Sequence, residues 1–374
     1  MRIIYPYNEI LPKKRAHDTF IVHECAALAD LGGEVTLLVG KGSEKDNLFS
    51  HYAIPPSNPL HIKTLFILRK NNRLGLSWNL PFFWCCQKEI QKILPDYVIL
   101  SVRKQAAFHL SHKIPGVRYV YEVHELCYYP NQPFQSSYQL QLEKKALSHA
   151  DLVTVTTAAL KDILLAPPYS LKVPIEIVPL AVQAKALPLP SSLADPLVIA
   201  YVGQLYEGQG VANLLLAMSQ VQNVHLKIIG GRVQEIAQLS KLAKEMNVAG
   251  TVEFLGFIPP SQISSLVQEA HAFIAPFENT GRMPYVAHTK LFEYVEWGRP
   301  IIAPNLPIVQ EHFQQGSGAI LFEPDNPSSI AKCISALKDD HLRQKLQNEI
   351  SSCSGCYSWR ARAQTYARLL QVDG

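Results

Sequence analysis

Short runs of apolar residues alternate with longer segments of helical periodicity along almost the whole chain. The first apolar run covers 2–6, a helical pattern follows at about 16–31, and a second apolar run covers 34–39. Short apolar runs bounded by turn residues are typical of buried strands, and apolar residues spaced three and four apart are typical of amphipathic helices. Regular strand–helix alternation predicts parallel sheets covered by helices, so the expected fold class is α/β.

The same alternation continues through the rest of the chain. Further strands are predicted at 60–68, 97–101, 118–123, 151–156, 175–180, 197–202, 225–229, 252–255, 272–275, 301–303 and 319–322. Further helices are predicted at 87–94, 136–149, 157–165, 211–219, 233–246, 260–268, 288–297, 307–315, 327–350 and 359–370.

One segment interrupts this alternation. Residues 184–196 are rich in proline and serine and lack periodicity, so we predict a linker there. A chain of 374 residues also exceeds the usual limit of a single core, which is roughly 250–300 residues. We therefore expect two Rossmann-like domains, at 1–183 and 197–355, and a final helical segment at 356–374. Two doubly wound parallel sheets that face each other form a central cleft, where small ligands bind.

Composition narrows the class of protein. Hydrophobic residues make up 48% of the chain and charged residues 18%, as in ordinary globular proteins, and the formal charge of +4 argues against a nucleic-acid binder. The seven cysteines are scattered, and the pair Cys353 and Cys356 lacks a second ligand pair for zinc, so we expect free thiols. No signal-peptide pattern and no apolar run of about 20 residues is present. We expect a cytoplasmic protein.

Residues 276–304 carry the strongest candidate chemistry. A polar loop precedes a short helix, which Gly298 is expected to end. The amino end of a helix presents unpaired N–H groups and the positive end of the helix dipole, so it favours phosphate. Lys290 adds a charge in the first turn, and Glu293 on the same helix face could accept both hydroxyls of a ribose. The simpler alternative is a surface ion pair between Lys290 and Glu293.

A second feature converges on the same place. The turn Gly203–Gly210 is rich in glycine and follows the first strand of the second half, and Gly230 ends the next strand. In a parallel sheet, these turns and the Lys290 helix all lie at the carboxyl ends of strands and so point to one cleft. This convergence favours a functional role for Lys290 and Glu293.

Basic residues follow two strands of the first half. Lys13, Lys14 and Arg15 occupy the first loop, where a glycine-rich phosphate turn is missing, and Arg103 follows a later strand. These side chains could meet a phosphate-bearing acceptor, or they could be ordinary solvated residues. His124 also ends a strand, so we expect it to face the cleft.

Residues 69–84 mix basic and aromatic side chains. Such a stretch could lie at a membrane interface, which would make the protein a peripheral one at the inner face of the membrane. The interpretation favoured here is that these aromatic residues belong to the core.

The second half resembles the nucleotide-binding domain of the retaining glycosyltransferases of family 4, which have the GT-B fold. The similar stretches are 197–215 (LVIAYVGQLYEGQGVANLL), 226–231, 254–258 (FLGFI) and 289–303 (TKLFEYVEWGRPIIA). The segment 357–370 (YSWRARAQTYARLL) looks like the family's closing helix, which returns to the amino-terminal domain. Weaker similarity in the first half covers 15–17, 32–37 and 121–126.

This resemblance implies transfer of a sugar, with retention, from a nucleotide sugar to a saccharide or lipid-linked acceptor in envelope or exopolysaccharide synthesis. It implies no cofactor, since the nucleotide sugar is a co-substrate. The chain has no Asp-x-Asp pair, which fits a site that needs no divalent metal. His124 and Lys290 would act in catalysis, with His124 near the donor sugar and Lys290 at the pyrophosphate. The donor-binding residues would be Gly203, Gln204, Gln209, Gly230, Phe257, Ile258, Arg282, Thr289, Lys290, Leu291 and Glu293. Those on the acceptor side would be Lys13, Lys14, Arg15 and Arg103.

Three positions depart from the family's pattern. Tyr285 replaces the first of two glutamates, and Gln204 and Gln209 replace an arginine and a lysine of the glycine-rich turn. Glutamine can still donate hydrogen bonds, and Arg282, Lys290 or Arg299 could supply charge. Two alternatives stay open: a binding or scaffold protein on a GT-B frame, and a nucleotide-sugar epimerase.

Overall fold

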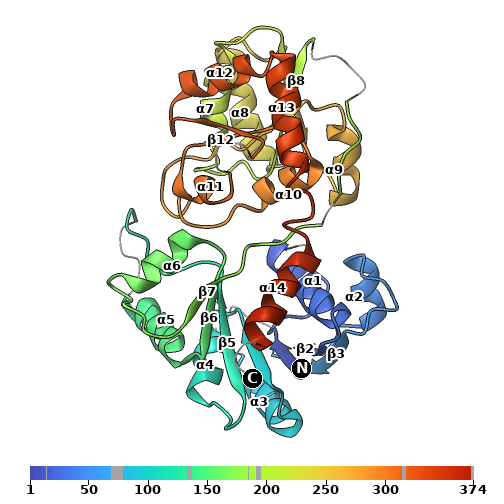
Figure 1. Cartoon of the computed structure of the whole chain (residues 1–374), viewed down its shortest axis with the longest axis vertical. Coiled ribbons are helices and arrows are strands. Elements are labelled where there is room, and N and C mark those ends of the chain that lie inside the picture. Colours follow the sequence, from blue (N-terminus) through green and yellow to red (C-terminus); the bar gives the residue numbers. More distant parts are fainter. Residues whose placement is uncertain are drawn as a thin grey trace. The chain divides into compact units, whose positions relative to one another are not determined.

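The chain forms two compact units, each built around its own sheet (Figure 1). The first unit comprises Met1–Ala181 and the chain from Trp359 onward, and the second comprises Val182–Ser358. The computed structural model describes residues 1–13, 15–68, 79–132, 137–183, 185–190, 195–313 and 317–371, except for the side chains of 260, 261 and 371.

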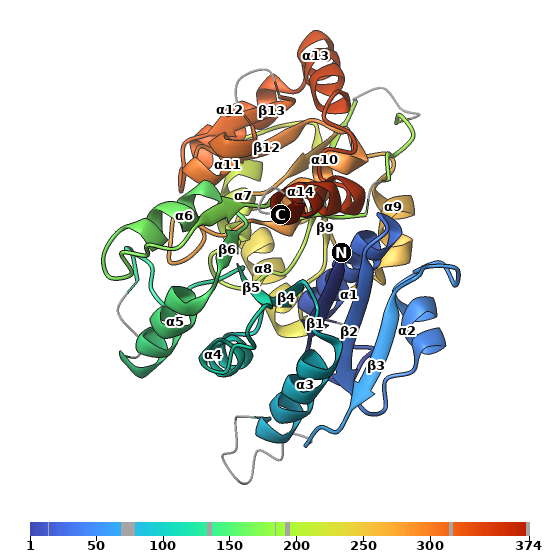
Figure 2. The same cartoon turned by 60° about the horizontal axis from the view of Figure 1, so that its bottom comes forward.

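The first unit holds a seven-stranded parallel sheet in the order β3-β2-β1-β4-β5-β6-β7, and Figure 2 shows β1, β2 and β3 side by side. Its strands are β1 (Arg2–Pro6), β2 (Glu34–Gly40), β3 (His61–Leu65), β4 (Tyr97–Leu100), β5 (Arg118–Val123), β6 (Leu152–Val155) and β7 (Ile175–Ile177). Its helices are α1 (Ala16–Asp30), α2 (Lys45–His51), α3 (Leu80–Ile93), α4 (Arg103–Ser111), α5 (Ser137–His149), α6 (Ala158–Leu165) and α14 (Trp359–Gln371). The strand order reverses between β1 and β4, the position at which such sheets bind ligands.

The second unit holds a six-stranded parallel sheet in the order β10-β9-β8-β11-β12-β13. Its strands are β8 (Leu197–Val202), β9 (Val224–Ile229), β10 (Val252–Gly256), β11 (Ala272–Ile274), β12 (Ile301–Pro304) and β13 (Ala319–Phe322). Its helices are α7 (Val211–Met218), α8 (Val233–Glu245), α9 (Pro260–Val267), α10 (Thr289–Trp297), α11 (Pro307–His312), α12 (Pro327–Ala336) and α13 (Asp340–Ser351). The predicted α/β class, with two Rossmann-like parallel sheets, is confirmed.

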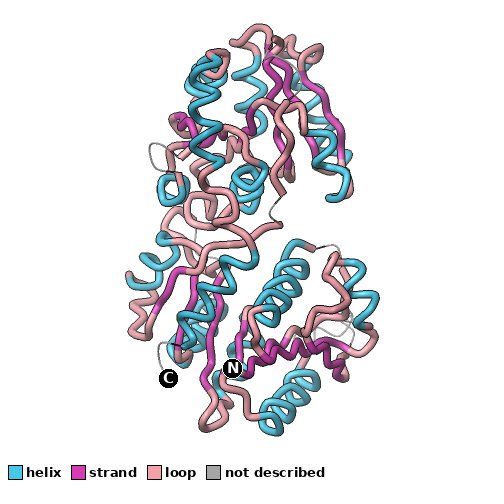
Figure 3. The backbone as a smooth tube through the Cα atoms, turned by 45° about the vertical axis from the view of Figure 1, so that its right-hand side comes forward, coloured by secondary structure: helices cyan, strands magenta, loops and turns pink. Residues whose placement is uncertain are grey.

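Both faces of each sheet are covered by helices (Figure 3). In β8, Ile199 and Tyr201 pack into one hydrophobic cluster, whereas Ala200 and Val202 pack into another on the opposite face. A strand that is buried on both faces shows a continuous apolar run rather than an alternating one, which explains the pattern of the sequence.

The final helix belongs to the first unit. Helix α14 lies beside α1 in Figure 1, and the two helices are in contact. Tyr366 of α14 is fully buried, and its hydroxyl shares a hydrogen bond of 2.8 Å with Thr154 of β6. The described parts of the predicted linker, 185–190 and 195–196, belong to the second unit, where the Leu187 N–H donates to the carbonyl of Trp297.

Several elements differ from the prediction. Helices α2 and α4 were not predicted, and α3 begins at Leu80 rather than at 87, with a proline in its first turn, where no backbone N–H is needed. The helix predicted at 327–350 is in fact two helices, because the Asp339 side chain accepts hydrogen bonds from two backbone N–H groups and starts α13 there. All seven cysteines are free, as predicted.

Candidate functional site

The amino end of α10 is held in place by a buried histidine. His288, the residue before the helix, stacks on Phe277 at 3.9 Å between ring centroids. Burial lowers the pKa of His288 to about 3, so the ring is neutral. Its Nε2 lies 2.8 Å from the carbonyl oxygen of Met283 and therefore carries the proton that it donates. At the other end, Gly298 adopts a left-handed conformation, φ 69°, that stops the helix as predicted.

Lys290 lies directly beside the glycine-rich turn. Its ammonium donates to the Tyr201 hydroxyl at 2.8 Å and to the side-chain oxygen of Gln209, and it lies 4.3 Å from the centre of the Tyr201 ring. A Cβ added to Gly203 would come within 3.0 Å of the ammonium. The structure thus brings together three residues that the sequence singles out, and it adds Tyr201, which the sequence pattern does not mark as a site residue.

Burial brings the pKa values of Lys290 and Glu293 together. It lowers the pKa of Lys290 to about 7, although Glu293 opposes this shift. It raises the pKa of Glu293 to about 7, although Lys290 opposes that shift. Among the described residues, no hydrogen bond reaches the Glu293 carboxylate. The Glu293 carboxylate is therefore poorly satisfied by the described residues, and the hydrogen-bond partners of the Lys290 ammonium are uncharged, as expected of groups that a ligand would complete.

Close backbone contacts explain the glycines of this region. Gly210 has a φ of 70°, and a Cβ there would lie 1.7 Å from the carbonyl oxygen of Pro276. Gly230 has a φ of 114°, and a Cβ there would lie 2.1 Å from the carbonyl oxygen of Gly203. Any larger residue would push these loops apart, so the glycines set the shape of the turn.

The other residues predicted to bind the donor differ in how far they are exposed to solvent. Thr289 and Gln204 are exposed, Arg282 is half-buried, and Phe257 is 68% exposed. Ile258 packs partly against the core.

Two side chains in this region belong to the core rather than to a ligand site. Leu291 is buried, and its N–H donates to the carbonyl of His288. Neither its side chain nor its N–H is therefore available to a ligand. Arg299 cannot supply phosphate-binding charge as suggested, because its guanidinium is buried and donates to the carbonyls of Ala270 and Pro188.

In the first unit, His124 follows β5 at the carboxyl edge of the sheet. Its ring packs edge-on against Phe20 at 4.7 Å and against His17 at 5.7 Å. Its Nε2 lies 3.5 Å from a carboxylate oxygen of Glu122, and this buried nitrogen makes no hydrogen bond within the described residues.

Carboxylates neutralise the described cations on the predicted acceptor side. Lys13 pairs with Glu9, and Arg15 lies 3.1 Å from both Glu9 and Asp18. Lys14 lies outside the described residues. Two of these pairs, Lys13 with Glu9 and Arg15 with Asp18, have i,i+4 and i,i+3 spacing, which the sequence could have revealed.

Arg103 is likewise neutralised, because it donates to Glu143 at 2.8 Å. The Glu143 carboxylate is fully buried and also accepts from the backbone N–H of Cys127. This pair ties α4 to α5, so Arg103 has a structural role in the unit.

The aromatic residues of 69–84 are divided between core and surface. Residues 69–78 lie outside the described residues. Phe82 and Phe83 are fully buried, as favoured, whereas Trp84 is 49% exposed. No helix in the described parts of the chain is both long enough and apolar enough to cross a bilayer.

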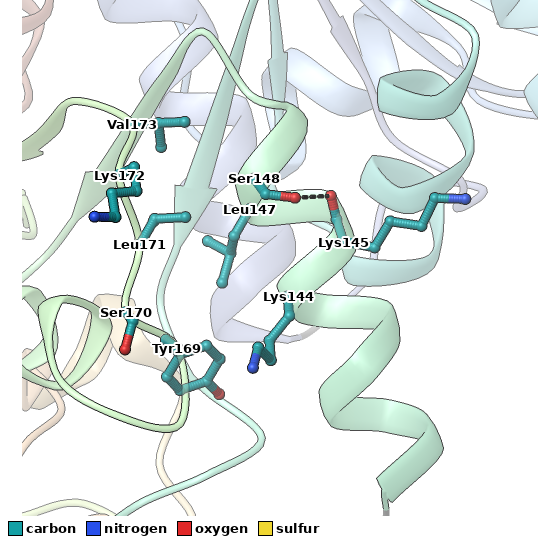
Figure 4. Close-up of a pocket in the computed structure, with 9 residues that line it drawn as sticks. All are labelled: Lys144, Lys145, Leu147, Ser148, Tyr169, Ser170, Leu171, Lys172 and Val173. Atoms are coloured by element: carbon teal, nitrogen blue, oxygen red, sulfur yellow. Dashed lines mark hydrogen bonds between the residues drawn. The ribbon is translucent and has the colours of Figure 1, made fainter.

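A pocket of about 400 Å³ in the first unit lies away from these groups (Figure 4). It is formed by the carboxyl-terminal half of α5 and by 169–173, which lead into β6 and β7 and therefore lie at the amino edge of the sheet. In Figure 4, Lys145 and Lys172 point away from the enclosed space. His124 stands at the opposite edge of the same sheet, so this pocket is separate from it.

Comparisons with known proteins agree with this architecture. A family model described as "Glycosyltransferase Family 4" matches residues 18–185, and one described as "Glycosyl transferases group 1" matches residues 190–352. D-inositol 3-phosphate glycosyltransferase from Corynebacterium urealyticum is 26% identical over 196 residues, which cover 50% of this chain and 44% of that protein.

Solved structures match over nearly the full length. Sucrose-phosphate synthase from Thermosynechococcus elongatus matches with a TM-score of 0.74 and 17% identity, over 99% of this chain and 98% of that one. Anabaena HepE in complex with UDP matches with a TM-score of 0.75 and 14% identity, over 100% of both chains. The fold is therefore GT-B. Together with the two family models, it identifies the chain as a glycosyltransferase of the GT-B type.

Proposed function

We propose that the protein transfers a sugar, with retention, from a nucleotide sugar held on the second unit to a saccharide or lipid-linked acceptor. One observation carries the proposal: Lys290 lies at the amino end of α10 against Gly203 and Gln209, with Glu293 one turn further on. HepE structures contain UDP, or UDP and glucose, which supports a nucleotide sugar as the donor.

The chemistry of the leaving group fits this geometry. Negative charge grows on the diphosphate as its bond to the sugar breaks, so fixed N–H groups and a cation lower the barrier. The first turn of α10 and the Lys290 ammonium supply both. Glu293 would accept hydrogen bonds from the hydroxyls of the ribose. The departing diphosphate would take the proton from the attacking hydroxyl of the acceptor. The site needs no cofactor and no metal in this scheme.

We place the reaction in envelope or exopolysaccharide synthesis, in the cytoplasm, with a peripheral contact at the inner face of the membrane. Exposed apolar side chains near the carboxyl end of β3 and at the start of α3 support that contact. They are Phe66, Leu68, Leu80 and Trp84. A hexose is the proposed sugar.

One observation favours a second candidate, a binding or scaffold protein. The Lys290 ammonium already donates to two uncharged protein groups, and Gln209 stands where the resemblance expects a lysine. A site with so few cations would hold a diphosphate weakly.

Release of nucleotide separates the two candidates. The purified protein would be incubated with UDP-, GDP- and ADP-sugars, and free nucleotide would be measured alongside binding by titration calorimetry. A glycosyltransferase releases nucleotide from one donor by transfer or slow hydrolysis, whereas a scaffold binds without release. An unchanged donor affinity in Glu293→Ala would remove the ribose role.

A further inference from the structure

Beneath His124 lies a buried ionic cluster that the donor chemistry does not use. Its centre is Arg362 of α14, whose side chain is 2% exposed. Its Nε donates to Glu24 of α1 at 3.1 Å, and its Nη2 donates to Glu122 of β5. Its Nη1 donates to the carbonyl of Val178 at 2.6 Å. Three segments that are distant in the sequence therefore meet at one guanidinium.

Glu122 lies between this arginine and His124. Its Oε1 receives the Arg362 hydrogen bond and lies 3.5 Å from His124 Nε2, which has ion-pair distance but not hydrogen-bond geometry. Its Oε2 accepts from the Tyr5 hydroxyl at 2.8 Å. Both oxygens are thus fixed, and the Glu122 carboxylate cannot turn away from the histidine.

The two glutamates have opposite charge preferences. Burial raises the pKa of Glu24 well above its usual range, although Arg362 opposes the shift. Burial also disfavours the charged form of Glu122, but Arg362 and His124 outweigh it and hold the pKa of Glu122 below its usual range. At neutral pH, Glu122 is therefore the ionised partner of Arg362, and its charge faces His124.

Apolar contacts connect the same helix to the same histidine. Trp359, the first residue of α14, packs against Phe20 at 5.2 Å between ring centroids, and Phe20 packs against His124 at 4.7 Å. The ring of His124 is thus supported from α14 along an ionic route and an aromatic route.

We infer that Glu122 is the positioning residue of His124, and that Arg362 of the carboxyl-terminal helix holds Glu122 in place. A carboxylate beside Nε2 keeps the proton on that nitrogen and orients the ring, as carboxylates do for other functional histidines. The long contact would shorten when donor and acceptor are bound, as is common for catalytic hydrogen bonds. This inference rests on the proposed function and on the role near the donor sugar that the family resemblance implies for His124.

The test compares two matched substitutions, Glu122→Gln and Glu24→Gln. Both glutamates are 1% exposed and both accept from Arg362, but only Glu122 has His124 beside it. The first readout is the NMR titration of the His124 ring, assigned with His124→Gln, and it needs no substrate. The second is the pH profile of kcat with the active donor.

Glu122→Gln should move the titration midpoint of His124 to lower pH by about 1–2 units, because an adjacent opposite charge is lost. The acidic limb of the kcat profile should move with it, and Glu24→Gln should change neither. Arg15, Asp18 and Arg362 also face this region and are unchanged in both variants. His17 titrates separately, because burial and, to a smaller extent, the charge of His124 lower the pKa of His17 to about 4.

If Glu122 had a purely structural role, both substitutions would lower the melting temperature by similar amounts and the titration midpoint of His124 would not move. That result would overturn the inference. If Glu122→Gln does not fold, Glu122→Asp replaces it and should give a smaller shift in the same direction, with Glu24→Asp as its control. An unmoved midpoint combined with lost activity in His124→Gln refutes the positioning role alone. A moved midpoint with full activity in His124→Gln refutes the proposed role of His124 and leaves the Glu122 pairing intact.

Discussion

The affinity for the donor should pass through a maximum near pH 7, because Lys290 and Glu293 titrate at about the same pH. A bound diphosphate favours the ammonium form of Lys290, so this contribution is present below the pKa of about 7 and is lost as the pH rises. Ribose hydroxyls favour the ionised form of Glu293, so this contribution is present above the pKa of about 7 and is lost as the pH falls. Beyond about one unit on either side, the affinity should fall up to about tenfold per pH unit.

Two substitutions separate the limbs of this curve. Lys290→Met should remove the alkaline limb, and Glu293→Gln should remove the acidic limb. At pH 7, loss of the charge-assisted contact in Lys290→Met costs about 1.5–3 kcal/mol, which corresponds to a roughly 10- to 150-fold weaker affinity.

Titration calorimetry between pH 5.5 and 8.5 measures this curve. The ligand should be an intact nucleotide sugar, whose phosphates keep a constant charge over that range. A flat profile for the unaltered protein would refute the reasoning, and so would both limbs surviving in Lys290→Met.

Three further substitutions test the buried contacts, the glycine-rich turn and the helix cap of the fold. Arg362→Met leaves two buried glutamates without their partner and should lower the free energy of unfolding in urea by about 3–5 kcal/mol; a loss below 1 kcal/mol would contradict the buried pairing. Gly210→Ala should abolish donor binding, because its Cβ would overlap a backbone carbonyl, whereas Gly250→Ala, with open space around it, should bind normally. Asp339→Ala removes the cap of α13 and should cost about 1 kcal/mol, measured by thermal unfolding; an unchanged midpoint would show that this cap is dispensable.

The sequence could predict the meeting of Lys290 with the glycine-rich turn, because the carboxyl ends of parallel strands share one edge. It could not reveal Tyr201, since a tyrosine inside an apolar run looks like any other core residue. Nor could it separate α12 from α13, because a capping aspartate is easily taken for a polar position within one helix.

The cluster at Arg362 was hidden for a different reason. Its partners Glu24 and Glu122 lie 338 and 240 residues away in the sequence, so no local spacing points to them. A glutamate within a helix or a strand also looks like an exposed position until the tertiary structure buries it. Long-range contacts of this kind need coordinates.

The central claim is that a nucleoside diphosphate binds at the amino end of α10. A crystal structure of the protein with a bound nucleotide sugar tests it most directly. The account predicts diphosphate oxygens within hydrogen-bond distance of Lys290 Nζ and of the first backbone N–H groups of α10, with the ribose hydroxyls on Glu293. A diphosphate bound elsewhere, with Lys290 still donating to Gln209 and Tyr201, would contradict it.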